Sequence, residues 1–192
     1  EMLIWYLRLA KLQIRAGGYN NAMNYIDEVI IQGEEHDFKQ YIAYGYLFAG
    51  ELCFHLGQVQ EAKQHLNTGM DMIQNLNLKI FVEFIGPIIR HYELNQQYSR
   101  AINELKESIN FIENNTEIVN SYLHKAINLY RLGRLQYKIE NFGNSKKMLE
   151  KALELLEIVN NFYFISECKI ILLQIKINQG KLYDKSQLEP YI

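Results

Sequence analysis

Hydrophobic positions recur with helical spacing along most of the chain, and residues 142–159 show the pattern most clearly. The apolar positions of this segment are Met148, Leu149, Ala152, Leu153, Leu155 and Leu156. The charged positions between them are Lys146, Lys147, Glu150, Lys151, Glu154 and Glu157. Because one turn of an α-helix takes about 3.6 residues, this spacing predicts an amphipathic helix with one buried and one solvated face.

The same spacing predicts nine helices arranged as successive pairs. First helices are expected at 3–16, 40–56, 79–95, 119–139 and 163–179. Second helices are expected at 20–33, 59–75, 98–113 and 142–159, with a short cap at 184–189. Pro87, preceded by Gly86, should kink the third first helix or delay its start, because proline disrupts a helix interior.

Five short segments between these helices resemble one another. They are 17–22 (GGYNNA), 57–62 (GQVQEA), 96–101 (QQYSRA), 140–145 (ENFGNS) and 180–185 (GKLYDK). Their last residues are 40, 39, 44 and 40 positions apart. A fixed period of this size indicates a helical repeat protein.

Each repeated segment has the chemistry of a tight turn between antiparallel helices. It opens on Gly or a polar residue, suited to the left-handed backbone conformation that ends a helix. An aromatic or aliphatic residue follows two positions later, and a small residue three positions after that. Lys185 breaks the small-residue rule, as expected of a terminal repeat without a further neighbour.

This pattern resembles the tetratricopeptide repeat (TPR) over nearly the whole chain. The second repeat matches through Tyr46, Ala49, Gly50, Gly57, Val59, Ala62, Leu66 and Gly69. The fourth matches through Leu129, Leu132, Gly133, Phe142, Leu149 and Ala152. The resemblance implies an all-α, right-handed superhelical solenoid of four full helix pairs plus a terminal helix and cap.

The chain departs from the common TPR pattern in its period of about 40 residues, against the usual 34, and in lacking a helix-ending proline. In its period it is similar to the longer-helix variant of bacterial MalT-like and Rap/PlcR-type regulators. That similarity implies an alternative function as a ligand-sensing regulatory segment. We expect residues 1–192 to form one domain cut from a longer protein, since Glu1 lies inside a predicted helix.

Composition restricts the class of partner. The net charge of −2 and the pI of about 6.3 provide no excess of positive charge for phosphates, so we expect no nucleic-acid binding by this segment. An RNA-binding helical repeat is a distant alternative for the same reason and because the 39–44 spacing is irregular. Cys53 and Cys168 lie far apart in sequence and form no CxxC motif, so we expect no disulfide framework. The absence of such a framework favours a reducing cytoplasm. The apolar window 80–89 is too short to span a membrane.

Signatures of enzyme chemistry are missing from the sequence. It contains no GxGxxG, GxxxxGK[ST], HExxH or GxSxG motif. The histidines, His36, His55, His65, His91 and His124, have no metal-ligand spacing. We therefore expect a non-enzymatic protein without a catalytic residue, cofactor or metal.

The TPR resemblance implies a concave groove lined by the first helices, suited to a protein or peptide. Carrying the family's groove positions over gives a basic and aromatic set: Arg8, Lys11, Arg15, Tyr44, Phe48, Arg90, Tyr130, Arg131, Arg134, Tyr137 and Lys138. Because arginine and aromatic residues dominate binding energy, and because the cations favour anions, we expect an acidic or carboxylate-bearing peptide.

Two alternatives for this residue set stay open. The aromatic residues could instead form the core between repeats, and the cations a solvated face. The carboxylate clamp of chaperone-binding TPR proteins needs one Lys and two Asn; Leu7, Lys11 and Phe48 stand at the matching positions, so we expect no chaperone-tail binding. A homodimer is also compatible with the sequence, because the C-terminal end carries apolar Leu188, Tyr191 and Ile192.

Overall fold

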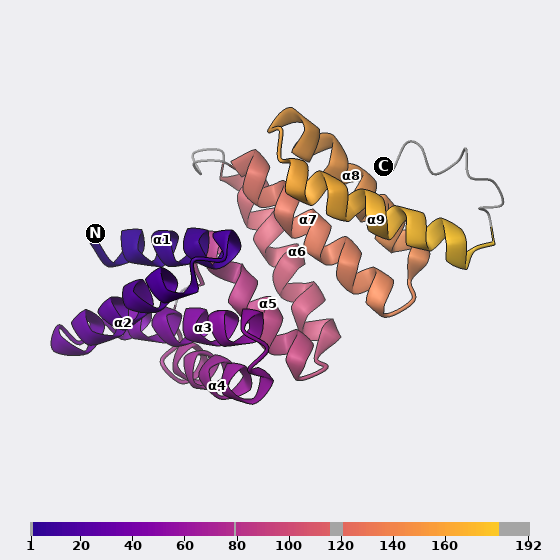
Figure 1. Cartoon of the computed structure of the whole chain (residues 1–192). Coiled ribbons are helices and arrows are strands. Elements are labelled where there is room, and N and C mark those ends of the chain that lie inside the picture. The colour runs from indigo at the N-terminus through magenta and orange to yellow at the C-terminus, as the bar shows by residue number, and fades with distance from the viewer. Residues whose placement is uncertain (1, 79, 116–120, 181–192) are drawn as a thin grey trace. The chain divides into compact units, whose positions relative to one another are not determined.

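The structure, a computed structural model, describes residues 2–78, 80–115 and 121–180. All regular elements in these ranges are helical (Figure 1). They are α1 (Met2–Ala16), α2 (Tyr19–Glu35), α3 (Lys39–His55), α4 (Val59–Asn75), the 3₁₀ turn η1 (Val82–Phe84), α5 (Ile85–Leu94), α6 (Tyr98–Asn114), α7 (Ser121–Lys138), α8 (Phe142–Ile158) and α9 (Phe162–Asn178).

The predicted helices are confirmed with boundaries that mostly agree to within one or two residues, and α5 differs most. It begins at Ile85 rather than near residue 79, after the turn η1. Pro87 is its third residue, where a missing N–H removes no intrahelical hydrogen bond. The predicted delay at Pro87 is therefore confirmed. The cap predicted at 184–189 lies outside the described residues.

The chain divides into two compact units, Glu1–Gln97 and Tyr98–Ile192. The division falls between the two helices of the third predicted pair. The single domain expected over residues 1–192 stays a prediction.

In the first unit, neighbouring helices approach closely at glycines. A Cβ atom on Gly69 of α4 would lie 2.7 Å from the carbonyl oxygen of Ala43 in α3. A Cβ atom on Gly45 of α3 would lie 2.5 Å from the Cγ1 atom of Ile30 in α2. Side chains of α3 such as Leu47 and Leu52 are completely buried between these neighbours, so α3 is the central helix of this unit.

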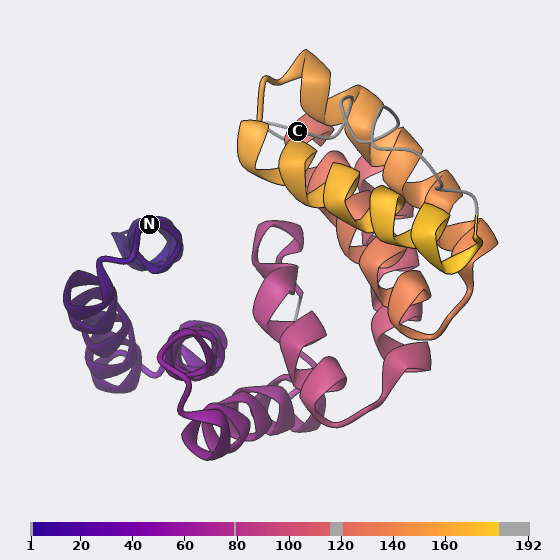
Figure 2. The same ribbon diagram turned by 45° about the vertical axis from the view of Figure 1, so that its right-hand side comes forward.

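In the second unit, α7 packs against α6, α8 and α9, and α8 packs against α9 (Figure 2). The buried core of the last three helices includes Ala126 of α7, Leu149 and Leu156 of α8, and Cys168 and Ile175 of α9. The small residue Ser145 of the repeated turn is also buried, and its hydroxyl donates to the carbonyl oxygen of Gly133 over 2.8 Å. Close helix approach at this position was predicted and is confirmed.

The turns between helices share one backbone conformation. Residues with positive φ follow the helices at Gly17, Asp37, Gly57, Asn77, Gln96, Glu140, Asn160 and Gly180. In the turn after α3, the amide of Gln58 donates to the carbonyl oxygen of Cys53, and the amide of Gly57 donates to that of Phe54. This pair of bonds is a Schellman-type helix end. The left-handed residue predicted after the first helices is confirmed, and it also follows the second helices.

Candidate functional site

Two sets of three cations occupy equivalent positions in the two units. The repeated turns align Ala22 with Ser145, and the same register places Arg8, Lys11 and Arg15 of α1 at the positions of Arg131, Arg134 and Lys138 of α7. In both helices the spacing is i, i+3 and i+7, which brings three side chains to one helix face. We refer to these sets as the α1 cation stripe and the α7 cation stripe.

The α7 cation stripe is positioned by contacts with α6. The half-buried Arg131 donates through Nη1 to Oδ1 of Asn128 over 3.3 Å. Asn128 is buried, and its Nδ2 donates to the hydroxyl of Ser108 in α6 over 2.9 Å. Lys138 is exposed, with its ammonium 5.2 Å from the centre of the Tyr98 ring. The stripe therefore combines the exposed Lys138 with the half-buried Arg131 and Arg134.

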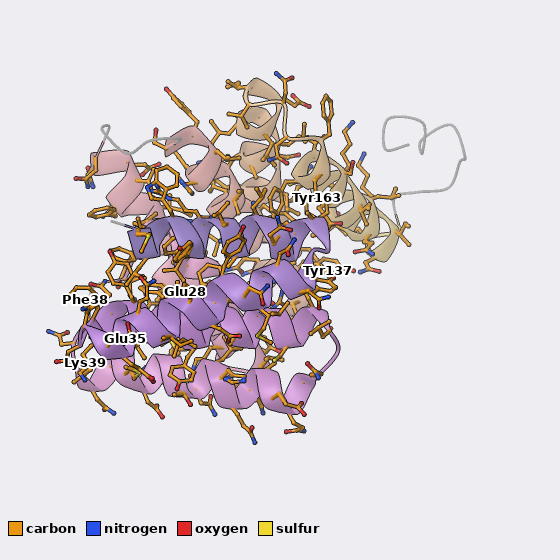
Figure 3. All side chains as sticks on the ribbon, turned by 60° about the vertical axis from the view of Figure 1, so that its left-hand side comes forward. Glu28, Glu35, Phe38, Lys39, Tyr137 and Tyr163 are labelled. Carbon is orange, nitrogen blue, oxygen red and sulfur yellow. The ribbon has the colours of Figure 1, made fainter. Side chains whose placement is uncertain are left out.

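Tyr130 and Tyr137 lie beside this stripe with different exposure. Tyr130 is buried, its ring centre lies 5.1 Å from that of Phe164, and its hydroxyl donates to Glu167 over 3.0 Å. Burial raises the pKa of Tyr130 well above its usual value; Glu167 raises this pKa further, and Arg134 opposes the shift. Tyr137, labelled in Figure 3, is half-buried, and its hydroxyl accepts from Nδ2 of Asn178 over 3.3 Å.

The α1 cation stripe lies along aromatic surfaces of the first unit. The Arg8 guanidinium is 4.8 Å from the centre of the Trp5 ring, and the Lys11 ammonium is 5.7 Å from that of Phe84. Arg15 is exposed. Cations over ring faces are favourably placed because the ring quadrupole attracts them.

Arg90 lies between two carboxylates. Its Nε lies 3.5 Å from Glu51 of α3, and its Nη1 lies 3.4 Å from Glu93. The guanidinium carbon is 4.0 Å from the centre of the Phe54 ring, and His55 lies 3.7 Å from Glu51. Arg90, Glu51, Glu93 and His55 thus form an ion-paired cluster between α3 and α5.

Tyr44 and Phe48, predicted as groove residues, are buried in the first unit. Tyr44 stacks on Phe81 with ring centres 5.1 Å apart, and its hydroxyl accepts from the Phe81 amide over 2.5 Å. Phe48 meets Phe84 edge to face at 5.4 Å. Tyr44 and Phe48 pack against the segment around η1, and Tyr130 packs against α9. All three side chains are buried, which is the core role left open by the sequence. Arg15 and Lys138 are the exposed members of the predicted set, and the half-buried members are Arg8, Lys11, Arg90, Arg131, Arg134 and Tyr137.

Four residues that contact the predicted set were not predicted from the sequence. Tyr98 and Glu167 come from α6 and α9 rather than from the helix that carries the stripe. Phe81 and Phe84 lie in and before η1, at the start of the segment that was predicted as helix 79–95 and that is not α-helical before Ile85. Pairings of this kind depend on tertiary packing and leave no spacing signal in a single sequence.

The remaining candidate groups are the potential metal ligands and the two thiols. Among the described residues, no three His, Cys, Asp or Glu side chains gather closely enough to hold a metal ion. Cys53 and Cys168 are free thiols and both are buried. Burial raises the pKa of both, and that of Cys168 to about 12, so they are protonated at neutral pH. None of the described helices is both long and apolar enough to cross a membrane.

Comparison with solved structures supports the helical-repeat fold. The sequence matches no protein-family profile and no curated protein. Among solved structures it is similar to BtubC (BKLC) from P. vanneervenii, with 14% identity and a TM-score of 0.62 over 90% of this chain and 71% of that one. It is also similar to a Podosopora anserina putative kinesin light chain with nearly identical TPR-like repeats, with 14% identity and a TM-score of 0.60 over 99% of this chain and 91% of that one. The chain therefore has the fold of a TPR-like repeat protein.

Proposed function

We propose that this chain is a protein-binding module that holds acidic peptide segments on the α1 and α7 cation stripes. A TPR-like fold is typical of protein-interaction scaffolds, which supports the general class. The observation that carries the specific proposal is the recurrence of three cations at the same repeat positions in both units.

The spacing of the stripe residues suits carboxylates along an extended chain. Residues four positions apart on a helix are separated by about 6 Å along its axis. Alternate side chains of an extended peptide are separated by about 7 Å. Acidic residues at every second position could therefore meet Arg134 and Lys138 together. Each charge-assisted hydrogen bond to a carboxylate contributes on the order of 1.5–3 kcal/mol.

Glu167 limits where a ligand carboxylate can bind beside the α7 cation stripe. It lies against the Tyr130 hydroxyl, and its negative charge disfavours a ligand carboxylate placed towards α9. On that side, the side-chain amide of Asn178 lies beside Tyr137. We therefore expect a peptide whose acidic residues follow α7, with neutral or amide-bearing residues on the α9 side.

The test is titration of a fluorescein-labelled peptide with alternating Glu and Gly, monitored by anisotropy, against the full chain. Arg134→Glu combined with Lys138→Glu should weaken binding by more than about tenfold, roughly 1.4 kcal/mol. Arg134→Lys should retain part of the affinity, because a cation remains without the planar fork.

The matched control reverses two exposed lysines of the same unit, Lys147→Glu with Lys151→Glu. It produces the same change in net charge away from the stripe. Far-UV circular dichroism verifies that all variants are folded. Equal loss of binding in the control, or undiminished binding in the stripe variant, contradicts the proposal.

The regulatory alternative rests on the length of the helices. Six of the described helices, α2, α3, α4, α6, α8 and α9, have 17 residues each, in keeping with the 40-residue period. Localisation in the cytoplasm and a homodimer stay predictions as well. A full-length gene encoding an adjacent helix-turn-helix or nucleotide-binding domain would support the regulatory function, and a free-standing reading frame would contradict it.

A further inference from the structure

A buried polar pair connects α6 to the α7 cation stripe. Asn128 of α7 is 2% exposed, and Ser108 of α6 is 7% exposed. The Nδ2 group of Asn128 donates to Oγ of Ser108 over 2.9 Å, and Oδ1 of Asn128 accepts from Nη1 of Arg131 over 3.3 Å. The amide of Asn128 is therefore hydrogen-bonded at both ends, to the neighbouring helix and to a stripe residue.

The arginine determines which way this amide is turned. A guanidinium carries only hydrogen-bond donors, so the atom of Asn128 that faces Arg131 must be the carbonyl oxygen. The Nδ2 group then faces Ser108, whose hydroxyl oxygen can accept. The two hydrogen bonds depend on one another, because an amide turned the other way would lose the bond to Arg131.

Two equivalent helix contacts of the chain are made by apolar or small residues. In the register of the repeated turns, the counterparts of Ser108 and Asn128 are Val29 and Gly45 in the α2–α3 contact, and Ala152 and Cys168 in the α8–α9 contact. All four counterparts are buried. A Cβ atom on Gly45 would lie 3.6 Å from Cγ1 of Val29, so these two positions face one another. The fold can therefore fill this contact without a polar group.

Stability alone does not account for the polar pair. Replacing both members of a buried hydrogen bond by apolar groups of the same shape is nearly neutral or stabilising. Sites that depart from the local rules of packing are often functional. The feature that sets Asn128 apart is its hydrogen bond to Arg131.

We propose that Asn128, held by Ser108, is a positioning residue that orients the Arg131 guanidinium at the α7 binding surface. This inference rests on the proposed binding of acidic peptides by the α7 cation stripe. An arginine side chain loses much rotamer freedom when a ligand orders it. Because Asn128 already holds one N–H group of the planar guanidinium, part of this loss occurs on folding rather than on binding.

The test replaces the polar pair with the residues of the α8–α9 contact, as Ser108→Ala with Asn128→Cys. The new side chains are close in size to the originals, so the urea midpoint should equal or exceed that of the parent. The alternating Glu/Gly peptide should bind this variant roughly three- to tenfold more weakly in the anisotropy titration, because the ligand must then order Arg131. A purely structural role for the pair would not lower the affinity of an equally stable protein, so undiminished binding overturns the proposal.

A double-mutant cycle shows whether the pair acts through Arg131. In an Arg131→Ala background, replacing the polar pair should cause no further loss of affinity, because the guanidinium that it positions is gone. Losses that add fully would give Asn128 a role independent of Arg131 and would also overturn the proposal.

The matched control is Ser145→Ala, which alters another buried serine of the second unit. The Ser145 hydroxyl joins α8 to the backbone of α7 at Gly133. Its removal should lower the urea midpoint and leave the peptide affinity unchanged. A comparable loss of affinity in this control would show that binding responds to any polar substitution in the core, contrary to a specific role of Asn128.

The ordering of Arg131 is measured without peptide, which separates this inference from the proposed function. NMR relaxation of the Arg131 Nε–H group, assigned with Arg131→Ala, should show a lower order parameter in the Ser108→Ala, Asn128→Cys variant than in the parent. Equal order in the two proteins rejects the positioning role even where the parent binds the peptide. Lower order in the variant, with a parent that binds no acidic peptide, supports the positioning of Arg131 and rejects the proposed function.

Discussion

At the residue scale, the fold depends on small residues where helices approach closely. A Cβ atom on Gly133 of α7 would lie 2.6 Å from the Cγ atom of Leu149 and 3.3 Å from its backbone nitrogen. Leu149 is completely buried and has little freedom to move. Both residues are among those that carry the TPR resemblance, so this contact follows from the sequence pattern.

Gly133→Ala should destabilise the second unit by about 1–3 kcal/mol, because the added methyl group overpacks the α7–α8 contact. The matched control is Gly143→Ala in α8, where a Cβ atom meets no other atom within 4 Å. Alanine there should be neutral or stabilise by up to about 1 kcal/mol, because it restricts the unfolded chain. Urea unfolding followed by circular dichroism measures both, and similar midpoints for the two variants would contradict the packing argument.

The burial of the aromatic residues could not be predicted from the sequence. The positions of Tyr44 and Tyr130 on the first helices follow from the repeat, but their partners do not. Phe81 and Glu167 are each 37 residues away in sequence, and Phe81 lies outside any helix. Whether a helical aromatic residue is buried depends on such partners, so the sequence left core and groove roles open for both tyrosines.

At the element scale, most of the fold was predictable because helix length, turn and period all agree. The exception, α5, begins late because Pro87 suits only the first turn of a helix. The left-handed residues after the second helices, such as Asp37 and Asn160, were not predicted because these turns lie outside the five repeated segments. Side-chain caps are also local: Asn141 and Asn161 each accept a backbone N–H at the start of α8 and α9.

Helix ends with a non-glycine residue at positive φ hold avoidable strain. Glu140 ends α7 with φ of 60°, a conformation that costs side-chain-bearing residues about 1 kcal/mol relative to glycine. Glu140→Gly should therefore stabilise the second unit by about 1 kcal/mol, measured as a higher urea midpoint.

The converse substitution serves as the control for this prediction. Gly57 has φ of 77° and open space around it, so Gly57→Ala changes only the backbone preference. It should destabilise the first unit by about 1 kcal/mol. A Glu140→Gly protein less stable than the parent would show that Glu140 makes a favourable interaction that outweighs its backbone strain.

At the scale of the whole molecule, the net charge is negative, whereas the charge of the α1 and α7 cation stripes is positive. The chain carries −2 overall, yet the α1 and α7 cation stripes concentrate six positive side chains on two helix faces. Acidic residues are grouped elsewhere, as in α2, which has four and no basic residue. Local potential rather than net charge governs a ligand within a Debye length, about 10 Å at 0.1 M salt.

Because the two charges differ in sign, the salt dependence of binding shows which of them governs the affinity for an acidic peptide. If the cation stripes hold the alternating Glu/Gly peptide, raising ionic strength from 0.05 to 0.5 M should weaken binding, because salt screens the local attraction. If net charge governed the encounter, added salt would instead strengthen binding by screening the repulsion between two anions. Anisotropy titrations across this range distinguish the two, and the Arg134→Glu, Lys138→Glu variant provides the control because its slope should approach zero or reverse. A parent protein whose affinity rises with salt would contradict an electrostatic role for the stripes.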